Sequence, residues 1–95
     1  NGAVGLVRQD ADTLAVTVAG ATGGTQVSVA GTAGARTVSG VGAGELSASS
    51  NQAVNGSQLF ATNTNVSTNA SNIAKNSSDI AGNTTAISNV TNRVT

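Results

Sequence analysis

A seven-residue repeat of apolar side chains occupies the last third of this 95-residue chain. From residue 59 onward an aliphatic residue recurs at every seventh position, here called position a, which holds Leu59, Val66, Ile73, Ile80, Ile87 and Val94. A seven-residue period averages 3.5 residues per turn, slightly fewer than the 3.6 of a straight α-helix. The apolar stripe therefore stays on one side only if several helices wind around one another with a left-handed twist. We expect residues 59–95 to form a coiled coil.

Position d, three residues after each position a, is mostly polar. It holds Thr62, Asn69, Asn76, Asn83 and Val90. β-branched residues at a, without leucine at d, disfavour a two-stranded zipper and favour three parallel strands. The many Asn, Ser and Thr residues are weak helix formers, each costing up to ~0.7 kcal/mol relative to Ala, so packing between chains must stabilise the helix. The predicted core of the coil consists of Leu59, Val66, Ile73, Ile80, Ile87, Val90 and Val94.

The asparagines at position d predict an anion site on the axis of such a coil. A buried amide costs free energy unless it is hydrogen-bonded. Three symmetry-related amides can turn their NH₂ groups inward and enclose an anion. We expect chloride, with water as the alternative occupant, at Asn69, Asn76 and Asn83. These residues would fix the register of the coiled coil and lower its stability. The simpler alternative is that the asparagines are solvated on a loose helix.

Asparagine also gives the chain a second possible role. Six Asn-x-Ser/Thr sequons are present, which in a secreted eukaryotic protein would be glycosylation acceptors; they begin at Asn55, Asn65, Asn69, Asn76, Asn83 and Asn89. A composition this rich in Asn, Ser and Thr produces sequons by chance. Glycans at the d positions could not coexist with axial side chains, so the two interpretations exclude each other.

The first half of the chain is typical of short β-strands between glycine turns. Apolar residues alternate with small ones over residues 13–19 and again over 26–30, as half-buried strands require. A third strand is expected at 36–41 and an earlier one near Val4–Val7. Three or four strands with so few large residues cannot close a core alone, so we expect several chains to share their valine faces. A flexible Gly/Ala/Thr linker is the alternative.

A connector of permissive backbone joins the two halves over residues 42–58. Gly42-Ala43-Gly44 begins it. Asn55-Gly56 predicts a turn, because both residues adopt positive φ readily. Ser57 is the predicted N-cap of a helix beginning near Gln58.

Composition argues against catalysis and against binding to nucleic acid. The chain lacks His, Cys, Trp, Tyr, Met and Pro, and Phe60 is its one aromatic residue. Nucleophilic catalysis needs a base beside a Ser or Thr, and neither His nor Cys is present. The carboxylates are scattered, and Asp10-x-Asp12 alone is a weak calcium pattern beside its simpler interpretation as solvated loop charges. Four basic and four acidic residues leave no electrostatic footprint for nucleic acid. We expect no enzyme, no catalytic residue, no metal, no cofactor and no membrane span in this sequence.

The connector carries a recognisable motif. Residues 52–63, Gln-Ala-Val-Asn-Gly-Ser-Gln-Leu-Phe-Ala-Thr-Asn, closely resemble the neck motif of trimeric autotransporter adhesins of Gram-negative bacteria. Residues 38–48 are similar to the strand and loop that precede that neck, and the coil is similar to stalk repeats with a β-branched residue at a and Asn at d. The family often has Asp where this chain has Gln52, which leaves one polar contact of the neck open. The resemblance assigns the neck motif to Ala53, Val54, Asn55, Gly56, Ser57, Gln58 and Leu59.

The resemblance implies an α+β homotrimer on the bacterial surface. It would comprise a β-rich head (residues 1–41), a neck (42–58) and a parallel left-handed three-stranded coiled-coil stalk (59–95). A C-terminal barrel beyond this sequence would anchor the fibre in the outer membrane, and the fibre would attach to host cells or extracellular matrix. A trimeric phage tail-fibre spacer without an adhesive role is the alternative.

Overall fold

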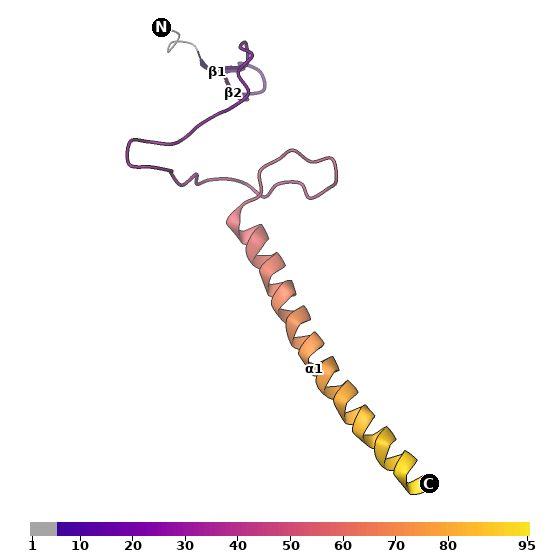
Figure 1. The fold of residues 1–95 in the computed structure, drawn as a ribbon. Helices are drawn as coiled ribbons and strands as arrows, with labels where there is room; N and C mark the ends of the chain where they lie inside the picture. The colour runs from indigo at the N-terminus through magenta and orange to yellow at the C-terminus, as the bar shows by residue number, and fades with distance from the viewer. Residues whose placement is uncertain (1–5) are drawn as a thin grey trace. The chain divides into compact units, whose positions relative to one another are not determined.

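The computed structural model describes residues 6–95, which belong to two units divided between Thr37 and Val38 (Figure 1). The first unit carries strands β1 (Val7–Gln9) and β2 (Val16–Val18). The second carries helix α1 (Gly56–Val94). A long helix with a small antiparallel sheet agrees with the expected α+β class in this coarse form. The boundaries predicted for head, neck and stalk stay predictions.

Strands β1 and β2 form an antiparallel hairpin in which Val7 lies opposite Val18 and Gln9 opposite Val16. The loop between them is fixed by Asp10, whose Oδ1 accepts hydrogen bonds from the backbone N–H groups of Asp12 (2.8 Å) and Thr13 (2.9 Å). This Asx turn replaces ladder pairing at the start of the strand expected over 13–19, so only Val16–Val18 is strand. Of the strand expected near Val4–Val7, Val7 begins β1, while residues 4 and 5 lie outside the described residues.

The strands expected over 26–30 and 36–41 are not formed, and these predictions were wrong for the isolated chain. Between them lies a tight turn in which Gly31 and Gly34 exchange backbone hydrogen bonds of 2.9 and 3.2 Å. The ladder does not extend beyond this pair, because an extended segment becomes a strand only beside another backbone that hydrogen-bonds to it. Alternation in the sequence does not reveal whether the same chain supplies that neighbour.

Helix α1 begins two residues earlier than expected. Its N-cap is Asn55, with φ −94° and ψ 172°, rather than Ser57. The predicted Asn55-Gly56 turn with positive φ is therefore wrong: Asn55 is extended and Gly56 is the first helical residue. At 1.5 Å per residue the 39 residues span roughly 58 Å. Arg93 in the last turn complements the helix dipole.

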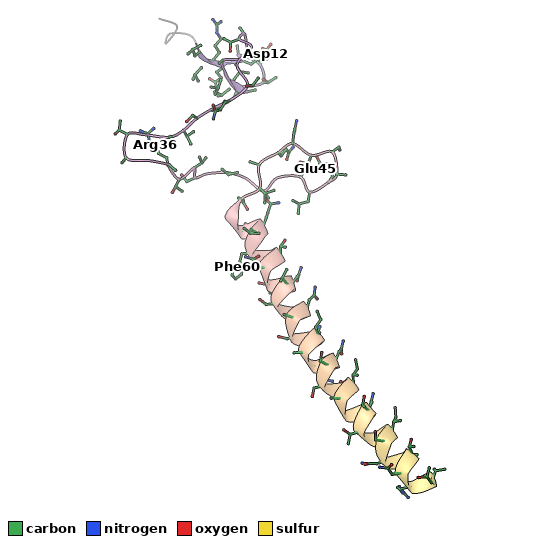
Figure 2. All side chains as sticks on the ribbon, in the orientation of Figure 1. Asp12, Arg36, Glu45 and Phe60 are labelled. Atoms are coloured by element: carbon green, nitrogen blue, oxygen red, sulfur yellow. The ribbon has the colours of Figure 1, made fainter. Side chains whose placement is uncertain are left out.

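No side chain of residues 6–95 is buried. The apolar stripe of α1 is 57–80% exposed at position a, and Val90 at position d is 56% exposed. Figure 2 shows the side chains of α1 projecting from the helix with nothing packed along its length. The described part of the chain thus folds into defined local structure without a hydrophobic core of its own. Within it, no helix is long and apolar enough to cross a membrane.

Candidate functional site: a hydrogen-bonded neck above an apolar stripe

The start of α1 is tied to the segment before it by the side chain of Asn55. Its Oδ1 accepts hydrogen bonds from the Gln58 backbone N–H (3.2 Å) and from the Ser57 hydroxyl (2.9 Å). Its Nδ2 donates to the Val41 carbonyl at 2.8 Å. One amide therefore caps the helix and holds the incoming chain against it.

Gln58 makes the second connection. Its Oε1 accepts from the backbone N–H groups of Gly44 (2.9 Å) and Asn55 (3.0 Å), and its Nε2 donates to the Gly44 carbonyl at 2.8 Å. The bond to Asn55 completes a capping box, in which N-cap and third helical residue each satisfy the other's backbone N–H. The two hydrogen bonds between the Gln58 side chain and the Gly44 backbone resemble the pair of hydrogen bonds that two residues exchange across neighbouring β-strands. We call Asn55 and Gln58, with their partners Val41 and Gly44, the neck clasp.

Residues 44–53 form a loop that closes on itself at its base (Figure 2, near Glu45). Gly44 lies against the Ala53 carbonyl so closely that a Cβ at Gly44 would collide with that oxygen. The Gln52 Oε1 accepts from the Glu45 backbone N–H at 2.8 Å, and the Ser50 Oγ accepts from the Gln52 backbone N–H at 3.1 Å. Gln52, which stands where the resembling motif often has Asp, thus supplies a polar contact of its own.

An open hollow of about 630 Å³ lies beside the clasp. Its walls are residues 38–41 on one side and 53–57 on the other. Val38 and Val54 are 60% and 52% exposed, so apolar surface of this hollow is uncovered in the single chain.

Below the neck, α1 carries the predicted coil positions on its exposed surface. Positions a and d are separated by about 60° around a helix of 3.6 residues per turn, so Asn69, Asn76 and Asn83 lie beside the apolar stripe. An axial role of these asparagines stays a prediction, because it depends on neighbouring helices. Lys75 Nζ lies 2.7 Å from Asp79 Oδ2 and forms an i,i+4 ion pair on the surface of α1. Both partners are exposed, so the pair stabilises the helix by only about 0.3–0.5 kcal/mol.

The sequence named the residues of the neck motif but not what they bind. The contacts of Asn55 with Val41 and of Gln58 with Gly44 were missed. The Asn-x-x-Gln spacing was the available signal, because it satisfies the capping-box pattern. The hydrogen bonds from Asn55 to Val41 and from Gln58 to Gly44 each join residues 14 positions apart, and such contacts have no local sequence signature.

Comparison with known proteins shows that the chain is homologous to segments of trimeric autotransporter adhesins. The resemblance to trimeric autotransporter adhesins found in the sequence is therefore confirmed. No family model matches the chain.

Two adhesins and one solved structure carry this conclusion. The chain is 59% identical over 63 residues (66% of its length) to the trimeric autotransporter adhesin AtaA of Acinetobacter sp. strain Tol 5. It is 42% identical over 67 residues (70%) to the autotransporter adhesin BadA of Bartonella henselae. The chain spans about 2% of the length of each. A solved C-terminal stalk fragment of AtaA, fused to adaptors, is 57% identical, with a TM-score of 0.63 over 70% of this chain and 19% of that one. These relatives are adhesins, rather than enzymes or phage fibres.

Proposed function

We propose that this chain is a surface-exposed segment of a trimeric autotransporter adhesin, in which three identical copies form a neck and a parallel, left-handed coiled-coil stalk. The segment acts as a fibrous spacer and contributes to attachment to host cells or extracellular matrix. It lies in the extracellular passenger region of an outer-membrane protein of a Gram-negative bacterium. Both relatives are named as autotransporter adhesins, and one as trimeric.

The observation that carries this proposal is the uncovered apolar stripe of α1. Seven aliphatic residues lie on this stripe at the spacing of a coiled coil, and they are 56–80% exposed. No side chain is buried in the described residues, so this part of the chain has no other hydrophobic core. Burial of apolar surface contributes about 25 cal/mol per Å². Winding three such helices together is the arrangement that covers the stripe and suits β-branched residues at a.

Within this trimer, Asn69, Asn76 and Asn83 form three axial layers. Each layer presents three amide NH₂ groups to one point on the axis and holds a chloride ion there. The polar layers set the register of the stalk and reduce its stability relative to an all-aliphatic core. The support for this is their regular spacing of seven residues beside the stripe.

Adhesion is tested by coating beads with the chain and measuring their retention on collagen-coated, fibronectin-coated and epithelial-cell surfaces. The matched control is the double variant Ile73→Asp and Ile80→Asp, which places charges in the stripe and prevents trimer formation. Retention well above this control supports an adhesive segment. Equal retention of the two proteins on every surface would restrict the segment to a spacer.

A further inference from the structure

Asn55 is followed directly by Gly56, and this pair of residues has a chemical reactivity of its own. The backbone nitrogen of Gly56 can attack the side-chain amide carbon of Asn55, because glycine has no side chain to shield that nitrogen. A bond forms between the Gly56 nitrogen and Asn55 Cγ, the Cγ–Nδ2 bond breaks, and ammonia leaves with the proton of the Gly56 N–H. Water then opens the resulting succinimide to aspartate or isoaspartate, so the reaction needs no reactant besides water.

The fold of the single chain gives no reason for a glycine at position 56. Gly56 is the first residue of α1 and is exposed. A Cβ at this position would meet no atom within 4 Å, and the φ of Gly56 lies outside the left-handed region that favours glycine. Glycine is also a poorer helix former than alanine. Alanine would therefore fit here, and it would remove the reactive Asn-Gly pair.

The neck clasp holds the Asn55 amide in a geometry from which this reaction cannot start. In the succinimide ring, Cβ of Asn55 and the nitrogen of Gly56 are eclipsed about the Cα–C bond, whereas at the observed ψ of 172° they are staggered. The amide itself is fixed on two sides, by the Val41 carbonyl at Nδ2 and by the N–H of Gln58 and the hydroxyl of Ser57 at Oδ1. Ring closure therefore requires the start of α1 to open locally.

The two products of the reaction differ from asparagine at the atom that fastens the neck. Aspartate at position 55 still accepts the Gln58 N–H as an N-cap, and its charge is favourable at a helix N-terminus. It has no N–H to donate, so a carboxylate oxygen would face the Val41 carbonyl, at a place where 2.8 Å now separates donor and acceptor. Two acceptors without a proton between them destabilise the contact. Isoaspartate lengthens the backbone by one methylene and displaces the cap as well.

We propose that Asn55-Gly56 is a self-modifying site, which the closed neck protects and which deamidates when the neck opens. The amide that is lost is the group that fastens Val41 to the start of α1. A deamidated neck therefore keeps its helix but closes without this tether, and the change is irreversible. This inference goes beyond the proposed spacer function and rests only on contacts within one chain.

The rate of deamidation at Asn55 tests the protection. The natural chain and the variant Gly56→Ala are incubated in mildly alkaline buffer, with and without guanidinium chloride, and conversion at Asn55 is followed by tandem mass spectrometry of the digested chain. The natural chain should deamidate at least about tenfold more slowly without denaturant than with it. In denaturant, Gly56→Ala should react at least about tenfold more slowly than the natural chain, because its methyl group shields the backbone nitrogen. Equal rates in either comparison would overturn the proposal.

The consequence of deamidation is tested with Asn55→Asp, and Asn51→Asp is the matched control, since Asn51 is exposed in the neighbouring loop. Amide hydrogen exchange is measured at Gly44, whose N–H donates to the Gln58 side chain, and at Gln58, whose N–H donates to Asn55 Oδ1. In Asn55→Asp, exchange at Gly44 should become at least about fivefold faster while Gln58 stays protected. Neither site should change in Asn51→Asp.

Unchanged exchange at Gly44 in Asn55→Asp, or equal acceleration at Gly44 and Gln58, would overturn the separation of cap and tether. Sedimentation equilibrium on the same samples tests the proposed trimer separately. A monomer that shows the expected rates and the expected exchange pattern would contradict the trimer and support the self-modifying site.

Discussion

At the scale of single residues, two amide side chains decide where the stalk begins. Asn55 and Gln58 together replace the missing helical partners of the first turn and bind backbone 14 residues earlier in the chain. The sequence identified both residues as part of a motif, but it predicted Ser57 as the N-cap. Ser57 instead donates its hydroxyl to Asn55. Propensity cannot separate two neighbouring N-cap formers when a distant carbonyl, here that of Val41, selects one of them.

Exchanging Asn55 and Ser57 separately for alanine distinguishes their roles. Asn55→Ala removes the cap, the bond to Ser57 and the bond to Val41, and should lower the free energy of unfolding by about 1–3 kcal/mol. Ser57→Ala removes one exposed hydrogen bond and should cost less than about 0.5 kcal/mol. Thermal unfolding followed by circular dichroism at the helix band measures both. A larger loss in Ser57→Ala than in Asn55→Ala would return the N-cap to Ser57.

Gly44 and Gly42 form a matched pair of glycines in the approach to the neck. A Cβ at Gly44 would collide with the backbone carbonyl of Ala53, which cannot move without opening the loop, whereas a Cβ at Gly42 meets nothing within 4 Å. Gly44→Ala should therefore destabilise the neck by about 1–3 kcal/mol. Gly42→Ala should be neutral or stabilising by up to about 1 kcal/mol, because it restricts the unfolded chain.

The glycine pair is measured by amide hydrogen exchange at Gln58 and Leu59, the residues whose N–H groups report on the start of the helix. Faster exchange is expected in Gly44→Ala alone. The same exchange rates in both variants would show that the loop does not close against Ala53.

Asp10 gives the hairpin loop a dependence on pH. Hydrogen bonds from the backbone N–H of Thr13, then that of Asp12, and then the Thr13 hydroxyl lower the pKa of Asp10 below its ordinary value of 3.8. A carboxyl whose pKa is lowered by folding stabilises the folded loop above the ordinary value, and this contribution is lost as the pH falls through the lower, folded pKa. The loop should therefore loosen only in strongly acidic solution.

The amide proton shifts of Asp12 and Thr13, followed by NMR during acid titration, check this expectation. They should change together at a pH below 3.8 in the natural chain. Asp10→Asn keeps an acceptor oxygen without an ionisable group, so its shifts should not titrate. A transition at or above the ordinary pKa, or an unchanged transition in Asp10→Asn, would assign the effect to another group.

At the scale of elements, the helix was predictable and the strands were only partly so. A stripe that repeats every seven residues from Leu59 to Val94 is a local property, and it placed α1 correctly apart from its first turn. Alternation over 26–30 and 36–41 indicated strands, yet neither forms in this chain, since a ladder needs a second backbone. Only the stretch that meets β1 across a capped loop, Val16–Val18, has one.

The stalk offers a test of the polar d layers. Replacing Asn69, Asn76 and Asn83 by Val should raise the thermal midpoint of the trimer by at least about 4–8 °C. The reason is that a buried amide costs free energy unless it is hydrogen-bonded, and the valine side chain has no such cost. When chloride is exchanged for sulfate at equal ionic strength, the melting temperature of the natural chain should fall relative to that of the triple variant, because the general stabilising effect of sulfate is common to both. The matched control is Ser71, Ser78 and Thr85→Val at the outer position f, where no gain is expected. Equal effects in the two triple variants would place the asparagines in solvent.

At the scale of the whole molecule, no side chain is buried in the described residues, and we expect the chain to acquire its core from other copies. Three features indicate that the core is made between copies: small residues in the first half, weak helix formers in the second half, and an exposed apolar stripe along α1. The shortage of large apolar residues is a property of the composition, so the missing core was predictable from the sequence. The clasp that joins the incoming segment to the helix was not predictable, because it pairs side-chain amides with backbone atoms that any residue would offer.

The mass of the natural chain in chloride buffer, measured by sedimentation equilibrium, tests this account most directly. Burial of the a stripe with β-branched residues at its core predicts a single species of three times the chain mass, with helical circular dichroism that is lost as the trimer dissociates. A folded monomer, or a stable dimer that persists on dilution, would contradict the three-stranded stalk and the axial asparagine layers at once.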